Sequence, residues 1–287
     1  MKYRNYRNRI QTPLIALALA SGLASAGTTE TTAPAPAPAP EEDVVSGVLK
    51  LDVNSHFISY GADVWGNGWD LGDATFNPML ELAFALPADL TFTLGTWWDV
   101  NSKAESSIGN QVQEVDVWAG LAYTYEKFTV GVTYQNWMYA SETENILDVK
   151  LAYDCFLSPS ITFHNRLDVG AAGSFDSTGA FSPGDEGTVV VFGLGHSLET
   201  GPVTWSFPLN VAWFVTEEFH AVGADSGIGY ASLGANASIS LTPYISECYG
   251  DWSFNAGLTY YVTDDGVIPN NPDSDFLTWT AGLAVNF

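Results

Sequence analysis

Two groups of polar residues in this sequence could bind a solute or an ion, and both fall at alternate positions of short apolar segments. The first group combines carboxylates with indole rings on three successive segments: Trp97, Asp99, Glu114, Asp116, Trp118 and Trp137. Ring faces can stack on a sugar or hold a cation while carboxylates bind it. The group therefore indicates either a solute site or an aromatic plug that fills part of the protein interior.

The second group is charged and lies on two consecutive segments joined by a short turn: Asp148, Lys150, His164, Arg166 and Asp168. Pairing residues 147–154 with residues 161–169 across that turn brings Asp148 near Arg166 and Lys150 near His164, with Asp168 adjacent. Two interpretations stay open. The group is either a ladder of salt bridges that stiffens one wall, or a charged constriction that selects solutes by the sign of their charge.

Catalysis and metal binding have less support. The histidines are His56, His164, His196 and His220, and none belongs to a recognisable nucleophile motif of a Ser–His hydrolase. The acidic run at 264–275 lacks the spacing of an EF-hand. Cys155 and Cys248 fall in turns, and whether they form a disulfide stays open. We therefore expect no catalytic residues, no metal and no cofactor, with a phospholipase-like barrel enzyme as a minor alternative.

The elements that position these residues are indicated by the end of the chain. Its last eleven residues alternate apolar side chains with small or polar ones, and the apolar set is Leu277, Trp279, Ala281, Leu283, Val285 and Phe287. This segment resembles the closing strand of Gram-negative outer-membrane β-barrels. The resemblance implies that Leu283, Val285 and the terminal Phe287 are a membrane-insertion signal read by the barrel-insertion machinery, which would then be a partner.

The beginning of the chain predicts export. Basic residues precede the apolar run Pro13-Leu-Ile-Ala-Leu-Ala-Leu-Ala20, and Ala24-Ser25-Ala26 follows. This is the pattern of a secretory signal peptide, residues 1–26, whose apolar core is too short to span a bilayer. Residues 27–45 are rich in Ala, Pro, Thr and acids and predict an extended, disordered tether. We therefore assign residues 46–287 to the folded domain.

Composition narrows the class of that domain. After the signal, the basic residues are Lys50, Lys103, Lys127, Lys150 and Arg166, against 33 acids in the chain. Such acidity argues against nucleic-acid binding. No apolar run after the signal is long enough for a membrane helix. A chain without such a run can enter a membrane only as a closed barrel, which satisfies every backbone group in lipid.

Period-two alternation predicts about twelve strands, at 48–60, 79–86, 90–100, 112–125, 128–139, 147–154, 161–169, 188–198, 203–214, 230–241, 252–262 and 276–287. Short connections alternate with long, Gly- and acid-rich ones. This pattern is typical of a transmembrane antiparallel up-and-down β-barrel, an all-β fold with both termini in the periplasm. Asn136 and Asn165 fall in the lipid-facing phase, and the strand at 188–198 can be phased either way.

Three short motifs carry a narrower resemblance. Leu157-Ser-Pro-Ser160, Gly193-Leu-Gly-His-Ser197 and Asp251-Trp-Ser-Phe-Asn-Ala-Gly-Leu258 are similar to segments of the TorF-type porins, while Trp65-Gly-Asn-Gly-Trp69 departs from that pattern. The family implies an outer-membrane barrel but no defined substrate.

Together these observations predict a porin-like channel in the outer membrane of a Gram-negative bacterium, embedded in its lipid bilayer. Acids outnumber bases on the inward phase, so we expect passive diffusion of small polar solutes with a mild preference for cations. The predicted pore-lining residues are Asp99, Glu114, Asp116, Asp148, Lys150, His164, Arg166 and Asp168, and the possible stacking residues are Trp97, Trp118 and Trp137. The alternative is a closed barrel that acts as a surface or scaffold protein through acidic extracellular loops.

Overall fold

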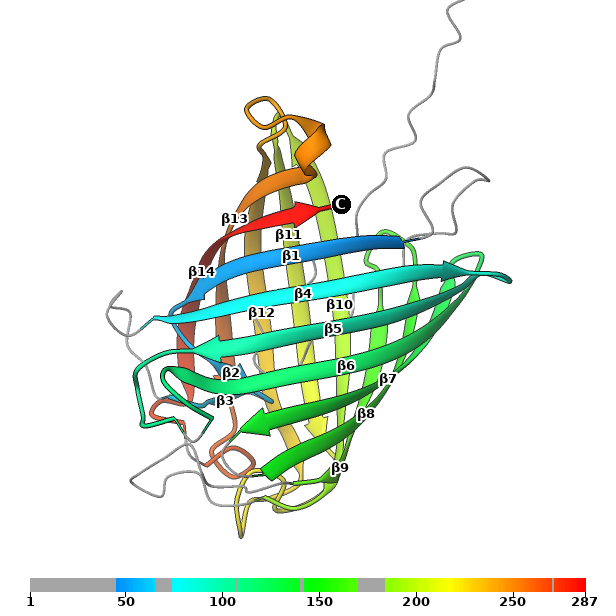
Figure 1. Ribbon diagram of the computed structural model, residues 1–287. Coiled ribbons are helices and arrows are strands. Elements are labelled where there is room, and N and C mark those ends of the chain that lie inside the picture. Colours follow the sequence, from blue (N-terminus) through cyan, green and yellow to red (C-terminus); the bar gives the residue numbers. More distant parts are fainter. Residues whose placement is uncertain (1–44, 66–73, 107, 140–141, 170–183, 270) are drawn as a thin grey trace, which may run out of the picture.

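The chain forms a closed antiparallel barrel of twelve strands in the computed structural model, which describes residues 45–65, 74–106, 108–139, 142–169, 184–269 and 271–287 (Figure 1). β1 closes the ring by pairing with β14, and the remaining wall strands pair in sequence order. The wall strands are β1 (Val45–Asn54), β4 (Thr75–Leu86), β5 (Leu90–Val100), β6 (Val112–Tyr125), β7 (Phe128–Tyr139), β8 (Glu142–Tyr153), β9 (Ser160–Asp168), β10 (Gly187–Thr200), β11 (Val203–Phe214), β12 (Gly227–Ser240), β13 (Asp251–Thr263) and β14 (Asp275–Asn286). The predicted all-β barrel is confirmed.

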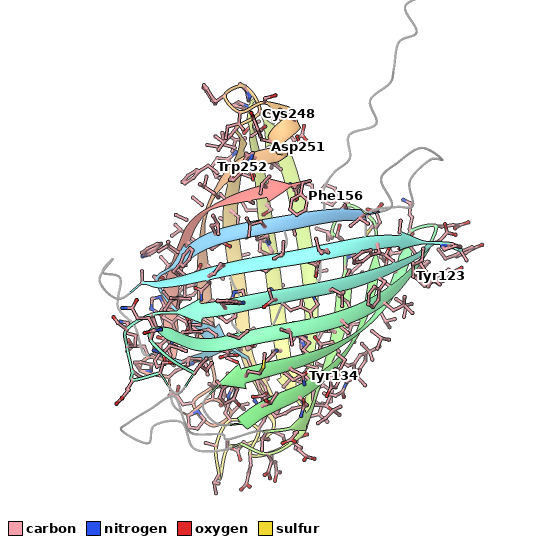
Figure 2. All side chains as sticks on the ribbon, in the orientation of Figure 1. Tyr123, Tyr134, Phe156, Cys248, Asp251 and Trp252 are labelled. Carbon is pink, nitrogen blue, oxygen red and sulfur yellow. The ribbon has the colours of Figure 1, made fainter. Side chains whose placement is uncertain are left out.

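Alternation of side chains explains why these segments close into a barrel. Along β6, Val117 and Leu121 are exposed on the outer face, while Asp116 and Trp118 are buried on the inner face. Tyr123 and Tyr134 lie on the outside of the wall in Figure 2, and both are more than one-third exposed. The outer face is therefore apolar and the inner face carries the polar groups. No helix in the described ranges has the length and apolar character needed to cross a membrane.

The barrel has two different ends, a turn end and a loop end. At the turn end, β5 follows β4, β7 follows β6 and β11 follows β10 after two or three residues. β1 begins and β14 ends there, where Gly47 N–H donates to Phe287 O at 2.7 Å and Phe287 N–H donates to Gly47 O at 3.0 Å. The terminal Phe287 is thus paired with the first strand. The side of the membrane that the turn end faces stays a prediction.

Several predicted boundaries are wrong. The first wall strand stops at Asn54 instead of residue 60, because the chain turns into the barrel after Ser55. The predicted loop at 140–146 is mostly strand, since β8 begins at Glu142. Val45, assigned to the tether, opens β1. The predicted signal peptide and the rest of the tether, residues 1–44, lie outside the described residues.

Two asparagines on the outer face, Asn136 and Asn165, form hydrogen bonds with neighbouring strands. Asn136 Nδ2 donates to Asn145 Oδ1 on the next strand, and Asn165 Nδ2 donates to Leu147 O at 2.8 Å. Thr188 Oγ1 donates to Asn165 Oδ1 at 2.9 Å. Because an apolar environment penalises mainly unpaired polar groups, these bonds let four adjacent strands carry polar side chains near the loop end.

The connections at the turn end carry the two cysteines. Cys155 and Cys248 are both free and exposed, Cys155 between β8 and β9 and Cys248 between β12 and β13. In Figure 2, Cys248 lies beyond the barrel wall, close to Asp251 and Trp252 at the start of β13. The structure thus contains no bond between these two thiols, and either can be replaced by serine without breaking a disulfide.

The two faces of one strand predict opposite tolerance of charge. Ala235→Arg places a cation on the exposed outer face at the middle of β12, and we expect a loss of about 2–4 kcal/mol of stability in a bilayer. Ser238→Arg, on the inner face of the same strand, should cost much less. Denaturant unfolding in lipid vesicles measures both, and equal losses would contradict the assignment of faces.

Candidate functional site in the barrel lumen

A segment of the chain folds into the loop end of the lumen. Residues 55–65, which we call the lumen segment, leave the wall after β1 and form a small hairpin of β2 (Ile58–Ser59) and β3 (Ala62–Asp63). In Figure 1 this hairpin lies within the loop end, behind the ends of β5 and β6. Its residues are buried, with Phe57, Ile58 and Tyr60 at most 2% exposed. The segment is therefore part of the interior instead of an external loop.

The lumen segment crosses the bore. Phe57 packs on Trp97 of β5 with ring centroids 5.3 Å apart, and Tyr60 packs on Trp137 of β7 at 5.4 Å. Gly61 lies against the ring of Tyr230 on β12. Because β5 and β12 are well separated around the ring, one short segment bridges distant parts of the wall.

Gly61 allows this close approach. Its φ is +82°, a left-handed conformation that side chains disfavour, and a Cβ there would lie 2.4 Å from Tyr230 Cδ1 and 2.9 Å from Ile268 Cδ1. A larger residue would have to strain the turn and displace both neighbours.

Asp99 anchors the end of the lumen segment. Trp65 Nε1 donates to Asp99 Oδ2 at 2.9 Å, and the same carboxylate accepts from Asn101 Nδ2 at 2.7 Å and Asn77 Nδ2 at 3.0 Å. Asp99 is fully buried. Three neutral donors thus satisfy a carboxylate that the sequence predicts to line a pore.

Two other loops hold the turn of the hairpin. The Nε2 of His220, between β11 and β12, lies 3.0 Å from Tyr60 O. Asn271, between β13 and β14, donates from Nδ2 to Gly61 O at 2.9 Å and accepts from Asp63 N–H at 2.8 Å. We call the groups that bind the lumen segment in this position, among them Asp99, His220 and Asn271, its seat. Both loops therefore form part of the seat.

Arg166 joins the wall to this seat. Its Nε donates to Glu144 Oε1 at 2.6 Å and its Nη1 donates to Phe219 O at 2.6 Å. The guanidinium carbon lies 3.7 Å from the centroid of the Phe219 ring and 5.5 Å from that of Tyr60. One buried cation thus contacts a strand, a loop and the lumen segment.

The predicted pairing within the second charged group is wrong: along β9, the residue opposite Asp148 is His164 instead of Arg166, the next inward-facing residue. Asp148 Oδ1 lies 2.7 Å from His164 Nδ1, and Arg166 binds Glu144 instead of Asp148. From the turn onward, the register places Asp148 opposite His164 and Ile146 opposite Arg166, two residues away from the expected pairing of Asp148 with Arg166.

The other two members of the second group are Lys150 and Asp168. Lys150 is half-buried and lies opposite Thr162, and Asp168 is exposed at the end of β9. Glu144 was not among the predicted site residues, because the polar outward residues Thr143 and Asn145 hide the alternation at the start of β8.

The predicted stacking residues already have partners. Besides the ring contacts of Trp97 and Trp137, Trp118 Nε1 donates to Glu81 Oε2 at 2.8 Å. One apolar cluster, which includes Trp137, joins the lumen segment to inward side chains of the wall and to the two loops: Ile58, Tyr60, Ala62, Trp137, Tyr139, Ile146, Val189, Ala212, Phe214, Phe219, Tyr230, Tyr261, Val267 and Ile268. In this conformation the rings contribute to a plug.

Glu114 and Asp116 are the least compensated acids of this region. Both face inward on β6, and their exposed fractions are 2% and 0%. In the described part of the chain, neither oxygen of Asp116 has a hydrogen-bond partner, and nor has the Oε1 of Glu114. Because two buried charges of the same sign repel, this pair should attract a positive charge wherever solvent reaches it.

A Ser–His–Asp arrangement also occurs in the lumen segment. Ser55 Oγ lies 2.6 Å from His56 Nδ1, and His56 Nε2 lies 3.9 Å from Asp63 Oδ2. Ser55 is fully buried, and its Oγ accepts from Trp279 N–H at 2.8 Å. A nucleophile needs access to substrate. This geometry fits an anchor for the lumen segment better than a hydrolase site.

The turn-end half of the lumen has a different lining. Its inner face on β11 to β13 consists of small polar side chains: Thr204, Ser206, Asn236, Ser238, Ser253 and Asn255. Most are half-buried. In the described part of the chain no group of three His, Cys, Asp or Glu side chains could hold a metal ion. The lumen thus combines a polar turn-end half with a filled loop-end half.

The wall can now be compared with known structures. The COG4313 outer membrane channel from Pseudomonas putida F1 aligns with a TM-score of 0.51 and 11% identity, over 87% of this chain and 99% of that one. The barrel shares this channel's fold. NanC porin aligns at 0.46 with 11% identity, over 83% of this chain and 98% of that one. KdgM porin aligns at 0.44 with 8% identity, over 84% and 99%.

No protein-family model and no curated protein matches the chain. The narrower resemblance to TorF-type porins stays a prediction.

The seat of the lumen segment predicts a dependence on pH. The pKa of His220 is lowered from its usual 6.5 to about 3. Burial is the largest cause and the nearby charge of Arg166 the second, while the hydrogen bond to Tyr60 O acts in the opposite direction. The contribution of neutral His220 to stability is therefore complete above pH 6.5 and is lost as pH falls toward 3.

Between pH 7 and pH 4 the protein should lose on the order of 2 kcal/mol more stability than the His220→Gln variant. Unfolding by urea in detergent at both pH values measures this difference. Equal losses would show that His220 is not buried in its neutral form.

Proposed function

We propose that the protein is a channel of the bacterial outer membrane that passes small hydrophilic solutes and favours cations mildly. The observation that carries the proposal is the closed barrel whose outer face is apolar and whose inner face is polar and acidic. Such a barrel satisfies its backbone in lipid and leaves a polar interior.

The proposed place in the cell follows from the same features. The bilayer contacts the apolar outer face, and export through the periplasm would use the predicted signal peptide. Phe287 and the strand before it would be recognised by the insertion machinery, with the turn end facing the periplasm. The backbone hydrogen bonds of Phe287 with Gly47 and the exposure of its side chain at that end support this proposal.

The charge balance supports a preference for cations. The inward-facing acids of the described strands include Asp52, Glu81, Asp99, Glu114, Asp116, Glu144 and Asp148, and the inward-facing basic residues include Lys50, Lys150 and Arg166. Arg166 is paired with Glu144. The remaining field attracts positive ions.

The alternative is a closed barrel that serves as a surface or scaffold protein through its loops. The filled loop-end half favours this alternative, because a permanent plug would block the path of ions through the lumen. The two functions differ in the native protein: a channel carries ions across a bilayer, whereas a scaffold with a permanent plug does not. A channel must in addition conduct once its lumen is free. For the minor enzyme alternative, release of fatty acid from phospholipid micelles is the assay.

The function is tested on a barrel whose lumen has been emptied. Residues 56–64 are replaced by a short Gly-Ser linker, and the purified barrel is recorded in a planar bilayer. We expect steady current with cation selectivity, because the remaining wall is polar. An insulating barrel that is still folded, as judged by its β-sheet circular dichroism, would contradict a channel.

The acids should set the selectivity of that current. In the same emptied barrel, Glu114→Gln with Asp116→Asn should reduce the reversal potential under a salt gradient by roughly half, because the pair is the least compensated charge. Glu126→Gln, an exposed acid in the turn between β6 and β7, is the matched control and should leave the potential unchanged. An unchanged potential in the double variant would remove the pair from the ion path.

A further inference from the structure

We propose that the lumen segment is a displaceable gate, seated in the structure in its closed position, and that solutes pass when it leaves its seat. The inference rests on the proposed channel function and adds the regulation of that channel. It follows from where the segment lies, how it is attached and which groups seat it.

Its position is that of a closure. The segment touches β5 through Phe57 and Trp65, β9 through the edge contact of Tyr60 with His164, and β12 through Gly61. His56 stacks on Phe276 of β14 at 6.0 Å. These contacts with β5, β9, β12 and β14 show that the segment fills the bore at the loop end. The turn-end half keeps its polar lining.

Its attachment differs from that of the wall. Wall strands are held by continuous backbone ladders, but the strands of the hairpin contribute two residues each. Among the described backbone hydrogen bonds, Ser55 N–H donates to Trp279 O of the wall, while Val64 N–H donates to Phe57 O within the segment. A two-stranded hairpin is marginal by itself. Its place therefore depends on side-chain contacts, which can break without opening the barrel.

Its seat is built from groups that can be released separately. Trp65 bonds Asp99, and Asn271 and His220 bond the backbone of the turn. Each neutral hydrogen bond contributes modestly. The apolar side chains Phe57, Ile58 and Tyr60 favour the seated position, because leaving it exposes them to water. The gate should thus be closed most of the time and open briefly.

A reversible covalent lock tests the gate. Asp63→Cys with Asn271→Cys places one thiol on the hairpin and one on its seat, at the contact where Asp63 N–H donates to Asn271 Oδ1 at 2.8 Å, so that a disulfide between them would lock the hairpin. Cys155 and Cys248 are both free and exposed, so they are first changed to Ser. Each single-cysteine variant, given the same oxidant, is the control.

We expect the unmodified protein in a planar bilayer to open in steps as large as the steady current of the barrel emptied at residues 56–64. Oxidation of the double-cysteine variant should reduce the frequency of openings by about tenfold or more, and reduction should restore it. Neither single-cysteine variant should respond to the oxidant.

Three results would overturn one proposal or the other. A current that oxidation of the lock leaves unchanged means that solutes pass beside the segment, which overturns the gate and keeps the channel. A silent native protein beside a conducting emptied barrel means a permanent plug, which overturns the gate and favours the scaffold. A silent emptied barrel overturns the channel itself.

A second variant weakens the seat without a cross-link. In Gly61→Ala the new methyl group would clash with the ring of Tyr230, and the positive φ at this position would be strained. The variant should therefore raise the frequency of openings by about tenfold. Gly195→Ala is the matched control, because a Cβ there meets nothing within 4 Å. An unchanged opening frequency in Gly61→Ala would show that this close approach does not hold the gate.

Discussion

The pairing of β1 with β14 is the constraint on which the rest of the structure depends. Twelve strands leave no free edge only when the first and last strands exchange backbone hydrogen bonds, from Val48 beside Asn286 to Asn54 beside Thr280. An open edge in lipid would leave a row of donors and acceptors unpaired. Closure also creates an interior that the chain must either fill or leave wet. Here the loop end is filled, and the turn end has a lining of small polar side chains.

The filled end explains the unusual burial of charge. Asp99, Glu144 and Asp148 are carboxylates that would be costly inside a protein, yet each has polar partners: three neutral donors, an arginine and a histidine. Their bonds hold the loops and the lumen segment against the wall. In this structure most of these acids therefore help to hold the plug in place. The Glu114–Asp116 pair is the least compensated charge that remains.

The sequence could predict the wall well and the plug poorly, for a physical reason. Strands such as 112–125, 128–139 and 203–214 match the structure at both ends, because a lipid-facing side and a polar side impose strict alternation. Residues 55–65 have no such constraint. Phe57 and Tyr60 continue an apolar pattern that fits a strand, and only contacts with Trp97 and Trp137, distant in sequence, place them inside. Arg166 illustrates the same limit, because β8 and β9 pair two residues away from the expected register and Arg166 therefore binds Glu144 instead of Asp148.

The most direct test of this account is the access of water to one inner position from each end. Ser238→Cys, placed in a barrel whose native cysteines are serine, lies on the inner face of the turn-end half. In oriented vesicles, a small membrane-impermeant thiol reagent should label it rapidly from the turn end and slowly from the loop end, because the seated lumen segment intervenes. Equal labelling from both ends would contradict the plug, and no labelling from either end would contradict a wet lumen.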